Sequence, residues 1–305
     1  AARLPRPAHP ASLVLSPLAR MLAVVHACVL ALARPLRRPA PAMPEREVTW
    51  SNPLGTSLTQ ISDNVWLAER PFFPTLVGLT STDVGCKMVV VRLMSGGLWV
   101  HSPVGLDGPM RRELAQLGEV QHVVTPNTEH QKWAPEWIRE YPDATGWACP
   151  GLRESKPEGG WQRSLEELLD APNGLTSSAA PSVWEGEIEL CWIQDRIPLL
   201  NRPFFNEVVF CHKPSATLIV TDLWWNYPRE SDLPEGVPSP SRETNLWKIG
   251  MDKIYRPFYN GLMHSSSWDQ SVETILSWNF EYIAPCHGEP VAEHGKQVLR
   301  DHLRI

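Results

Sequence analysis

The sequence has 305 residues, 43% hydrophobic and 20% charged, which is ordinary for a globular protein with one large core or two small ones. Its 30 prolines argue against a helix bundle, and its 14 tryptophans indicate broad, partly buried apolar surfaces. The formal net charge is −6 and there is no basic stripe with interleaved aromatic residues, so we do not expect nucleic acid as a partner.

The first 44 residues differ in composition from the rest of the chain. They contain six arginines, no lysine and no acidic residue, and their one apolar run, 21–33, is too short to span a bilayer. Such a segment is typical of an organelle transit peptide, so we expect it to be disordered and the protein to be in the chloroplast. The alternatives are a secretory signal, or an upstream extension of a cytoplasmic chain that starts at Met21 or Met43.

Residues 45–305 are predicted to form a single domain in which strands and helices alternate. In the first half, we expect strands over 58–68, 87–93, 98–101 and 120–124, and helices over 109–117 and 132–140. In the second half, we expect strands over 183–197, 207–212, 217–221 and 282–284, then a helix that begins near Ser267 and another at the end of the chain. This order indicates a layered α/β domain.

Two stretches lack a regular pattern. Residues 141–182 are rich in Pro, Gly and Ser, and we expect a partly ordered insertion that covers a cleft. Residues 228–266 begin with a run rich in proline and acidic residues, which predicts a long loop. These two stretches would set the substrate, which the rest of the sequence does not identify.

Four of the predicted strands end in polar residues of the kind that bind metal ions. These residues are His101, then Asn127, Glu129 and His130, then Asp222, and finally His287. Each alone has an ordinary explanation, as a turn residue, a helix cap or a buried histidine. Four strand ends of this kind, at the place where α/β proteins have their sites, indicate one common site.

The order and spacing of these residues resemble the metallo-β-lactamase fold, a four-layer αββα sandwich. In that fold, a strand that ends in Asp precedes a Thr-His-x-His-x-Asp-His motif. When this motif is placed on 124–130, its last His is His130 and its Asp is Glu129, while Asn127 and Thr125 replace the other two His.

Three further positions extend this resemblance. His101 takes the place of the early Asp, Thr221-Asp222 matches a later Gly-Asp, and His287-Gly288 matches a final His-Gly. An isolated His of the family is missing, because residues 202–207 read Arg-Pro-Phe-Phe-Asn-Glu.

Four short segments resemble an uncharacterised family of this superfamily more closely. They are 99–103, 125–127 followed by His130, 141–142, and 207–210 followed by Asp222. That family occurs in bacteria and photosynthetic eukaryotes and is described only as a domain of unknown function. The resemblance covers about residues 58–290.

The resemblance implies a site with fewer imidazoles than a two-metal centre requires. We expect His130, Asp222 and His287 to bind a single Zn²⁺ or Fe²⁺ ion, because two imidazoles and a carboxylate are sufficient for one ion. We expect Glu129 to act as general base, with Asp222 as a second catalytic residue. The remaining predicted residues, His101, Asn127 and Glu207, would line the cleft.

Two hypotheses about function follow. The first is a mononuclear metal-dependent hydrolase of a small ester, lactone or phosphate, which the analogy of fold favours. The second is a relative without metal or catalytic activity, which binds a small molecule or a protein through its Trp-rich loops. The sequence leaves the oligomeric state and the true start residue open.

Overall fold

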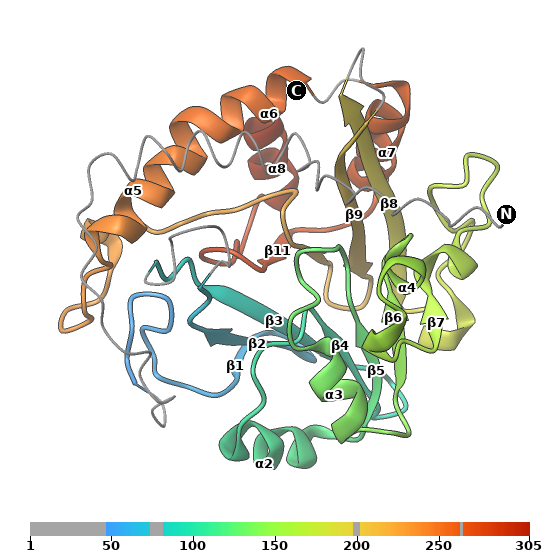
Figure 1. Cartoon of the computed structure of the whole chain (residues 1–305), viewed down its shortest axis with the longest axis horizontal. Coiled ribbons are helices and arrows are strands. Elements are labelled where there is room, and N and C mark those ends of the chain that lie inside the picture. The colour runs from blue at the N-terminus through green and yellow to red at the C-terminus, as the bar shows by residue number, and fades with distance from the viewer. Residues whose placement is uncertain (1–46, 74–81, 198–201, 263–264) are drawn as a thin grey trace, which may run out of the picture.

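Two β-sheets lie between two groups of helices (Figure 1). The structure is a computed structural model that describes residues 47–73, 82–197, 202–262 and 265–305. The predicted transit segment, 1–44, lies outside the described residues. Within the described part of the chain, no helix is both long enough and apolar enough to cross a membrane.

The first sheet has seven strands in chain order, and the second has four in the order β11-β10-β9-β8. The strands of the first sheet are β1 (Thr59–Ser62), β2 (Val65–Arg70), β3 (Cys86–Arg92), β4 (Leu98–His101), β5 (Val120–Val124), β6 (Thr145–Ala148) and β7 (Arg163–Ser164). The strands of the second are β8 (Ile188–Ile197), β9 (Arg202–His212), β10 (Thr217–Val220) and β11 (Tyr282–Pro285). Strands β4 to β7 run parallel, and so do β10 and β11.

Helices cover the outer face of each sheet (Figure 1). On the side of the first sheet, they are α2 (Gly108–Leu117) and α3 (Ala134–Glu140). On the side of the second sheet, they are α5 (Arg242–Gly250), the π-helical η5 (Met251–Tyr255), α6 (Arg256–Leu262), α7 (Ser266–Ser277) and α8 (Gly295–Leu303). Short helical turns complete the set: α4 (Leu152–Ser155), η1 (Pro157–Gly159), η2 (Leu165–Leu168), η3 (Ser182–Trp184) and η4 (Glu230–Asp232).

Successive side chains of a strand point to opposite faces of the sheet, and this alternation explains the layers. In β3, Met88 and Val90 pack toward α2 and α3, whereas Val89 and Val91 point into the space between the two sheets. The core between the sheets also contains residues of the second sheet, and the other face of that sheet packs against α7 and α8. This arrangement confirms the predicted αββα sandwich.

The predicted long loop at 228–266 is wrong for residues 242–262, which are helical through α5, η5 and α6. Helix α5 is capped by Ser241, whose hydroxyl accepts a hydrogen bond from the backbone N–H of Thr244 at 3.1 Å. The π turn in the middle shifts the apolar residues out of the 3.6-residue period, so the pattern does not look helical in the sequence. The following helix also begins earlier than predicted, because Ser265 caps α7.

The predicted insertion at 141–182 contains two strands of the first sheet, β6 and β7, which extend it in parallel from β5. These strands have four and two residues, too few to give a periodic pattern. Gly146 in β6 leaves room for the Ile138 side chain of α3, which would lie 2.6 Å from a Cβ at this position. The glycine that made this stretch look like a loop is therefore a packing requirement.

His302, on α8, is 5% exposed and packs edge-on against Trp225, with ring centroids 4.5 Å apart. Burial, and then the positive charge of Arg256, lowers its pKa to about 3. The unfolded chain binds a proton there near pH 6.5, so this histidine lowers the stability of the fold as pH falls below that value.

We expect His302→Phe to flatten the pH dependence of stability. Between pH 7.5 and pH 5, the variant should gain about 2 kcal/mol in unfolding free energy relative to the wild type, because it has no proton to bind. Urea unfolding at several pH values measures this difference. Replacing the exposed His294 with Asn serves as the control and should show no such gain; an equal gain there would contradict the assignment to His302.

Candidate metal centre

The carboxyl ends of four strands meet at one edge of the sandwich. Strands β4 and β5 end side by side in the first sheet, and β10 and β11 end side by side in the second. The chain after β5 carries His130, the chain after β10 carries Asp222, and the chain after β11 carries His287. A bridge between Asn127 and Glu207 joins the two sheets at this edge.

His130, Asp222 and His287 form a compact cluster. Their ligand atoms lie 3.2 Å apart (His130 Nε2 to His287 Nε2), 3.6 Å (His130 Nε2 to Asp222 Oδ1) and 3.5 Å (His287 Nε2 to Asp222 Oδ1). The side chains are 6%, 34% and 12% exposed in that order, so the cluster opens to solvent on the Asp222 side. Among the described residues, it is the group of His, Cys, Asp and Glu side chains arranged to hold a metal ion.

The spacing and the donor set fit a zinc-type ion. Ligands about 2.0–2.1 Å from a tetrahedral Zn²⁺ lie about 3.3 Å from one another, and the three observed separations bracket that value. Two imidazoles and one carboxylate also suit Fe²⁺. The sequence had indicated this trio, and the structure brings it together from three separate segments.

The other nitrogen of each imidazole has a partner that fixes the ring. His287 Nδ1 donates to the backbone oxygen of Gly85 at 3.0 Å, and His130 Nδ1 lies 2.7 Å from the hydroxyl of Ser102. Both Nε2 atoms therefore face the cluster, as metal-binding histidines usually require. Ser102 has a φ of +52°, an uncommon conformation for a residue other than glycine.

The charges of His130 and Asp222 stabilise each other. Burial disfavours a charged imidazole at His130, but the Asp222 carboxylate outweighs burial and holds the pKa of His130 well above its usual value. Burial likewise opposes ionisation of Asp222, and the His130 imidazolium outweighs it, so the pKa of Asp222 lies well below its usual value. A divalent cation must therefore displace a proton from His130, and its affinity should fall at acidic pH.

Asn127 orders the loop rather than lining an open cleft. Its side chain is buried, and its Oδ1 accepts from the backbone N–H groups of Glu129 at 3.0 Å and His130 at 2.9 Å. Its Nδ2 donates to Asp222 Oδ2 at 2.6 Å and to the Thr221 hydroxyl at 3.0 Å. One amide thus ties the His130 loop to Asp222.

Glu207 supports the turn that carries Asp222, through hydrogen bonds to its backbone. It is fully buried on β9, and its two oxygens accept from the backbone N–H groups of Thr221 at 2.7 Å, Asp222 at 2.8 Å and Leu223 at 2.9 Å. The turn that carries Asp222 is therefore shaped around this one side chain.

Two other residues at positions that carry the resemblance, His101 and Thr125, are not part of the cluster. His101 is fully buried between the sheets and stacks on Trp99, with ring centroids 5.6 Å apart. Its Nδ1 lies 3.9 Å from Cys286 Sγ. Thr125, in place of the first imidazole of the motif, accepts a hydrogen bond from Trp161 Nε1 at 2.9 Å. This indole comes from the stretch before β7, so that stretch closes the space beside the motif.

Glu129 is exposed and follows the buried Asn127 by two residues. Partial desolvation, followed by repulsion from the Asp222 carboxylate, raises the pKa of its carboxyl. The prediction that Glu129 is catalytic remains a prediction.

Several supporting groups were not predicted. Ser102 stands next to His101 in the sequence, where nothing predicts that its hydroxyl lies 2.7 Å from His130 Nδ1. Gly85 contributes a backbone oxygen, which leaves no sequence signal, and it lies 202 residues from His287.

Comparison with solved structures identifies the fold. A metal-soaked flavodiiron core, Flv1 from Synechocystis sp. PCC6803, is similar over 81% of this chain and 59% of its own, with 12% identity and a TM-score of 0.51. TMB-1, a structure described for substrate and inhibitor binding, matches over 81% of this chain and 96% of its own, with 14% identity and a TM-score of 0.49. A metallo-β-lactamase from Hirschia baltica matches over 81% and 95%, with 9% identity and a TM-score of 0.48.

No protein of curated function matches the sequence. The family model described as a domain of unknown function, DUF4336, matches residues 62–237, more than half of the chain. The chain has the metallo-β-lactamase fold, and it belongs to the DUF4336 family.

Proposed function

We propose that this protein is a mononuclear metal-dependent hydrolase of a small ester, lactone or phosphate. The observation that carries the proposal is the cluster of His130, Asp222 and His287, whose three ligand atoms lie 3.2–3.6 Å apart. Both rings are held with Nε2 toward the cluster, which supports metal binding over a chance meeting of polar groups. The Synechocystis protein of the same fold is itself described as metal-soaked.

Different residues of the site would have different roles in hydrolysis. The three residues of the cluster would hold a Zn²⁺ or Fe²⁺ ion, which would supply Lewis-acid chemistry for hydrolysis. Asn127 and Glu207 fix the Asp222 turn, so the carboxylate cannot swing away from the two imidazoles. Glu129 accepts the proton that the attacking water loses and passes it to the leaving group.

Metal analysis of the purified protein tests this proposal. We expect about one equivalent of Zn, Fe or Mn in the wild type and less than a tenth of an equivalent in Asp222→Ala, because the latter loses its only carboxylate ligand. Asp232→Ala, which removes an exposed carboxylate in the loop after β10, is the control and should keep its metal. A wild type with less than a tenth of an equivalent, even after incubation with Zn²⁺, would contradict the proposal and leave a metal-free binding protein.

Activity is then measured on chromogenic p-nitrophenyl esters, bis-p-nitrophenyl phosphate and simple lactones. We expect at least one class to be turned over by the metal-loaded wild type and not by Asp222→Ala. Removal of the metal with a chelator should abolish turnover, and Zn²⁺ or Fe²⁺ should restore it.

A further inference from the structure

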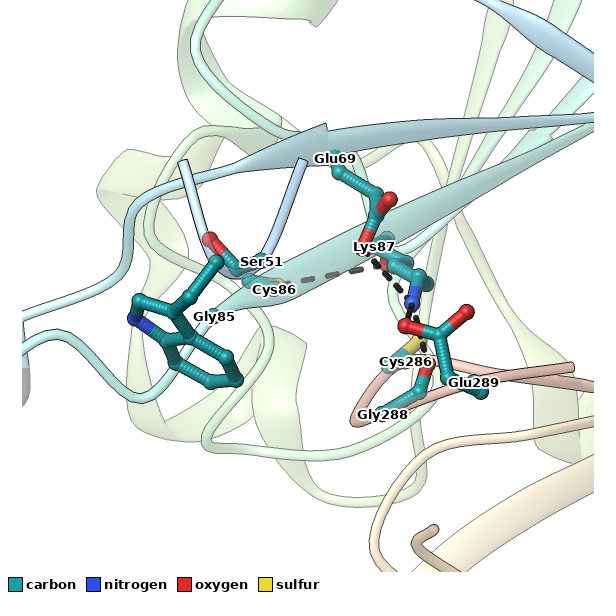
Figure 2. Close-up of a pocket in the computed structure, with 9 residues that line it drawn as sticks. Ser51, Glu69, Gly85, Cys86, Lys87, Cys286, Gly288 and Glu289 are labelled. Atoms are coloured by element: carbon teal, nitrogen blue, oxygen red, sulfur yellow. Dashed lines mark hydrogen bonds and ion pairs between the residues drawn. The ribbon is translucent and has the colours of Figure 1, made fainter. Parts of the chain in front are cut away.

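Lys87, on β3, is a buried lysine beside the loop that carries His287 (Figure 2). Its side chain is 4% exposed, and its Nζ lies 2.6 Å from Glu69 Oε1 and 3.7 Å from Glu289 Oε1. The same Nζ donates a hydrogen bond to the backbone oxygen of Gly288. A buried ammonium is costly unless such acceptors surround it, so its position and that of the loop depend on each other.

Backbone groups of β3 and of Gly85, the residue before it, hold the same loop. The N–H of Lys87 donates to the Cys286 oxygen at 2.8 Å, and the Gly85 oxygen accepts from His287 Nδ1 at 3.0 Å. Residues 85–87 therefore contact four successive residues, 286–289, two through backbone groups and two through the lysine. Lys87 is the one side chain in this set of contacts from β3, and its charge makes it the strongest.

The opposite side of the loop rests on Asn226. The N–H of Asn226 donates to the His287 oxygen at 3.2 Å, and the N–H of Glu289 donates to the Asn226 oxygen at 2.7 Å. Gly288 has a φ of +84°, and a Cβ there would lie 2.0 Å from the Asn226 oxygen. The loop is thus held between two segments, and its conformation is one that only glycine accepts readily.

A small cavity lies beside Lys87. Its volume is about 10 Å³, room for about one water molecule. Its lining includes Glu69, Cys86, Lys87, Cys286, Gly288 and Glu289 (Figure 2). Without the ammonium, the Glu69 and Glu289 carboxylates would repel each other, and residues 286–289 would lose the charge that holds them beside β3.

We propose that Lys87 is a positioning residue for the metal centre: its ammonium holds the 286–289 loop so that His287 Nε2 faces His130 and Asp222. This inference rests on the proposed function, because it assigns Lys87 a role in metal binding. Lys87 is not one of the three ligands, and its contacts with the loop are to Cys286, Gly288 and Glu289.

Zn²⁺ affinity, measured by competition with a chromogenic chelator at pH 8, tests the proposal. At that pH Glu69, whose pKa burial raises to about 7, is ionised and able to pair with Lys87. We expect Lys87→Met to bind Zn²⁺ about 10–100-fold more weakly than the wild type, the usual cost of losing a group that orients a ligand. Lys87→Arg should recover part of the affinity, because it keeps the charge and the donors.

The control is Arg92→Met, which removes an exposed cation from the far end of the same strand and should leave the affinity unchanged. If Lys87→Met binds Zn²⁺ within about threefold of the wild type, the positioning role is wrong while the metal centre stands. If Lys87→Met does not fold, the double variant K87Q/E69Q takes its place, because it leaves neither Lys87 nor Glu69 charged.

If the wild type binds no metal, the proposed function fails, and hydrogen exchange of the metal-free protein decides the role of Lys87. Peptides that cover 285–291 and 222–227 should then exchange at least tenfold faster in Lys87→Met than in the wild type. Unchanged exchange in both peptides would show that Lys87 does not hold the loop.

Discussion

Replacing Glu207 with alanine is expected to destabilise the protein by at least about 3 kcal/mol and to remove its metal. The variant leaves three backbone N–H groups, those of Thr221, Asp222 and Leu223, without their acceptor. Each buried donor left unpaired costs about 1–3 kcal/mol, unless water enters to satisfy it. Because the same turn carries Asp222, the loss of stability and the loss of metal should appear together.

Glu207→Gln should lie between the wild type and Glu207→Ala, since the amide keeps one acceptor oxygen. Burial, and then the Asp222 carboxylate, raises the pKa of Glu207 to about 7, so the comparison is made at pH 8, where the carboxylate form is present. Urea unfolding in a chelator gives the stability, and a Zn²⁺ titration gives the affinity.

Glu189→Gln, on the neighbouring strand β8 and only partly buried, is the matched control for Glu207→Gln and should change stability by less than about 0.5 kcal/mol. A Glu207→Ala variant within about 1 kcal/mol of the wild type, with its metal retained, would contradict the role given to this side chain.

The parts of the fold that were predictable are those with strong local patterns. The strands 98–101 and 120–124 were predicted with the bounds that the structure has, because each is a short apolar run closed by polar or turn residues. The helices 242–262 were missed because a π turn shifts their period, and β6 was missed because Gly146 looks like a loop residue.

The candidate site also has parts that could be predicted from the sequence and parts that could not. His130, Asp222 and His287 could be indicated from sequence, since each follows a strand and carries a metal-binding side chain. The groups that orient them could not be predicted: they are a backbone oxygen at Gly85, the hydroxyl of Ser102, and an ammonium about 200 residues from the loop it contacts. These contacts join segments far apart in the chain, and only the packing of the two sheets brings them together.

His101 shows the limit of arguing from position alone. It takes the place of an Asp in the related motif, and it was predicted to line the cleft. In the structure it lies in the apolar space between the sheets, where burial lowers its pKa well below the usual value. A neutral, stacked histidine is compatible with that environment, whereas an unpaired carboxylate would not be.

Glu129 is the proton acceptor of the proposed reaction. Glu129→Gln should lower kcat by about 100–10,000-fold on whichever ester, lactone or phosphate the wild type turns over, the range expected when a general base is lost. Metal content should stay within twofold of the wild type, because Glu129 lies outside the cluster formed by the two imidazoles and Asp222. Steady-state kinetics with parallel metal analysis separate these two quantities.

Glu136→Gln, on the adjacent helix α3, makes the same charge change and should retain wild-type kcat. If Glu129→Gln instead loses its metal together with its activity, the carboxylate is a fourth ligand. If kcat is unchanged, the proton must go to another group, such as the Asp222 carboxylate, which is 34% exposed.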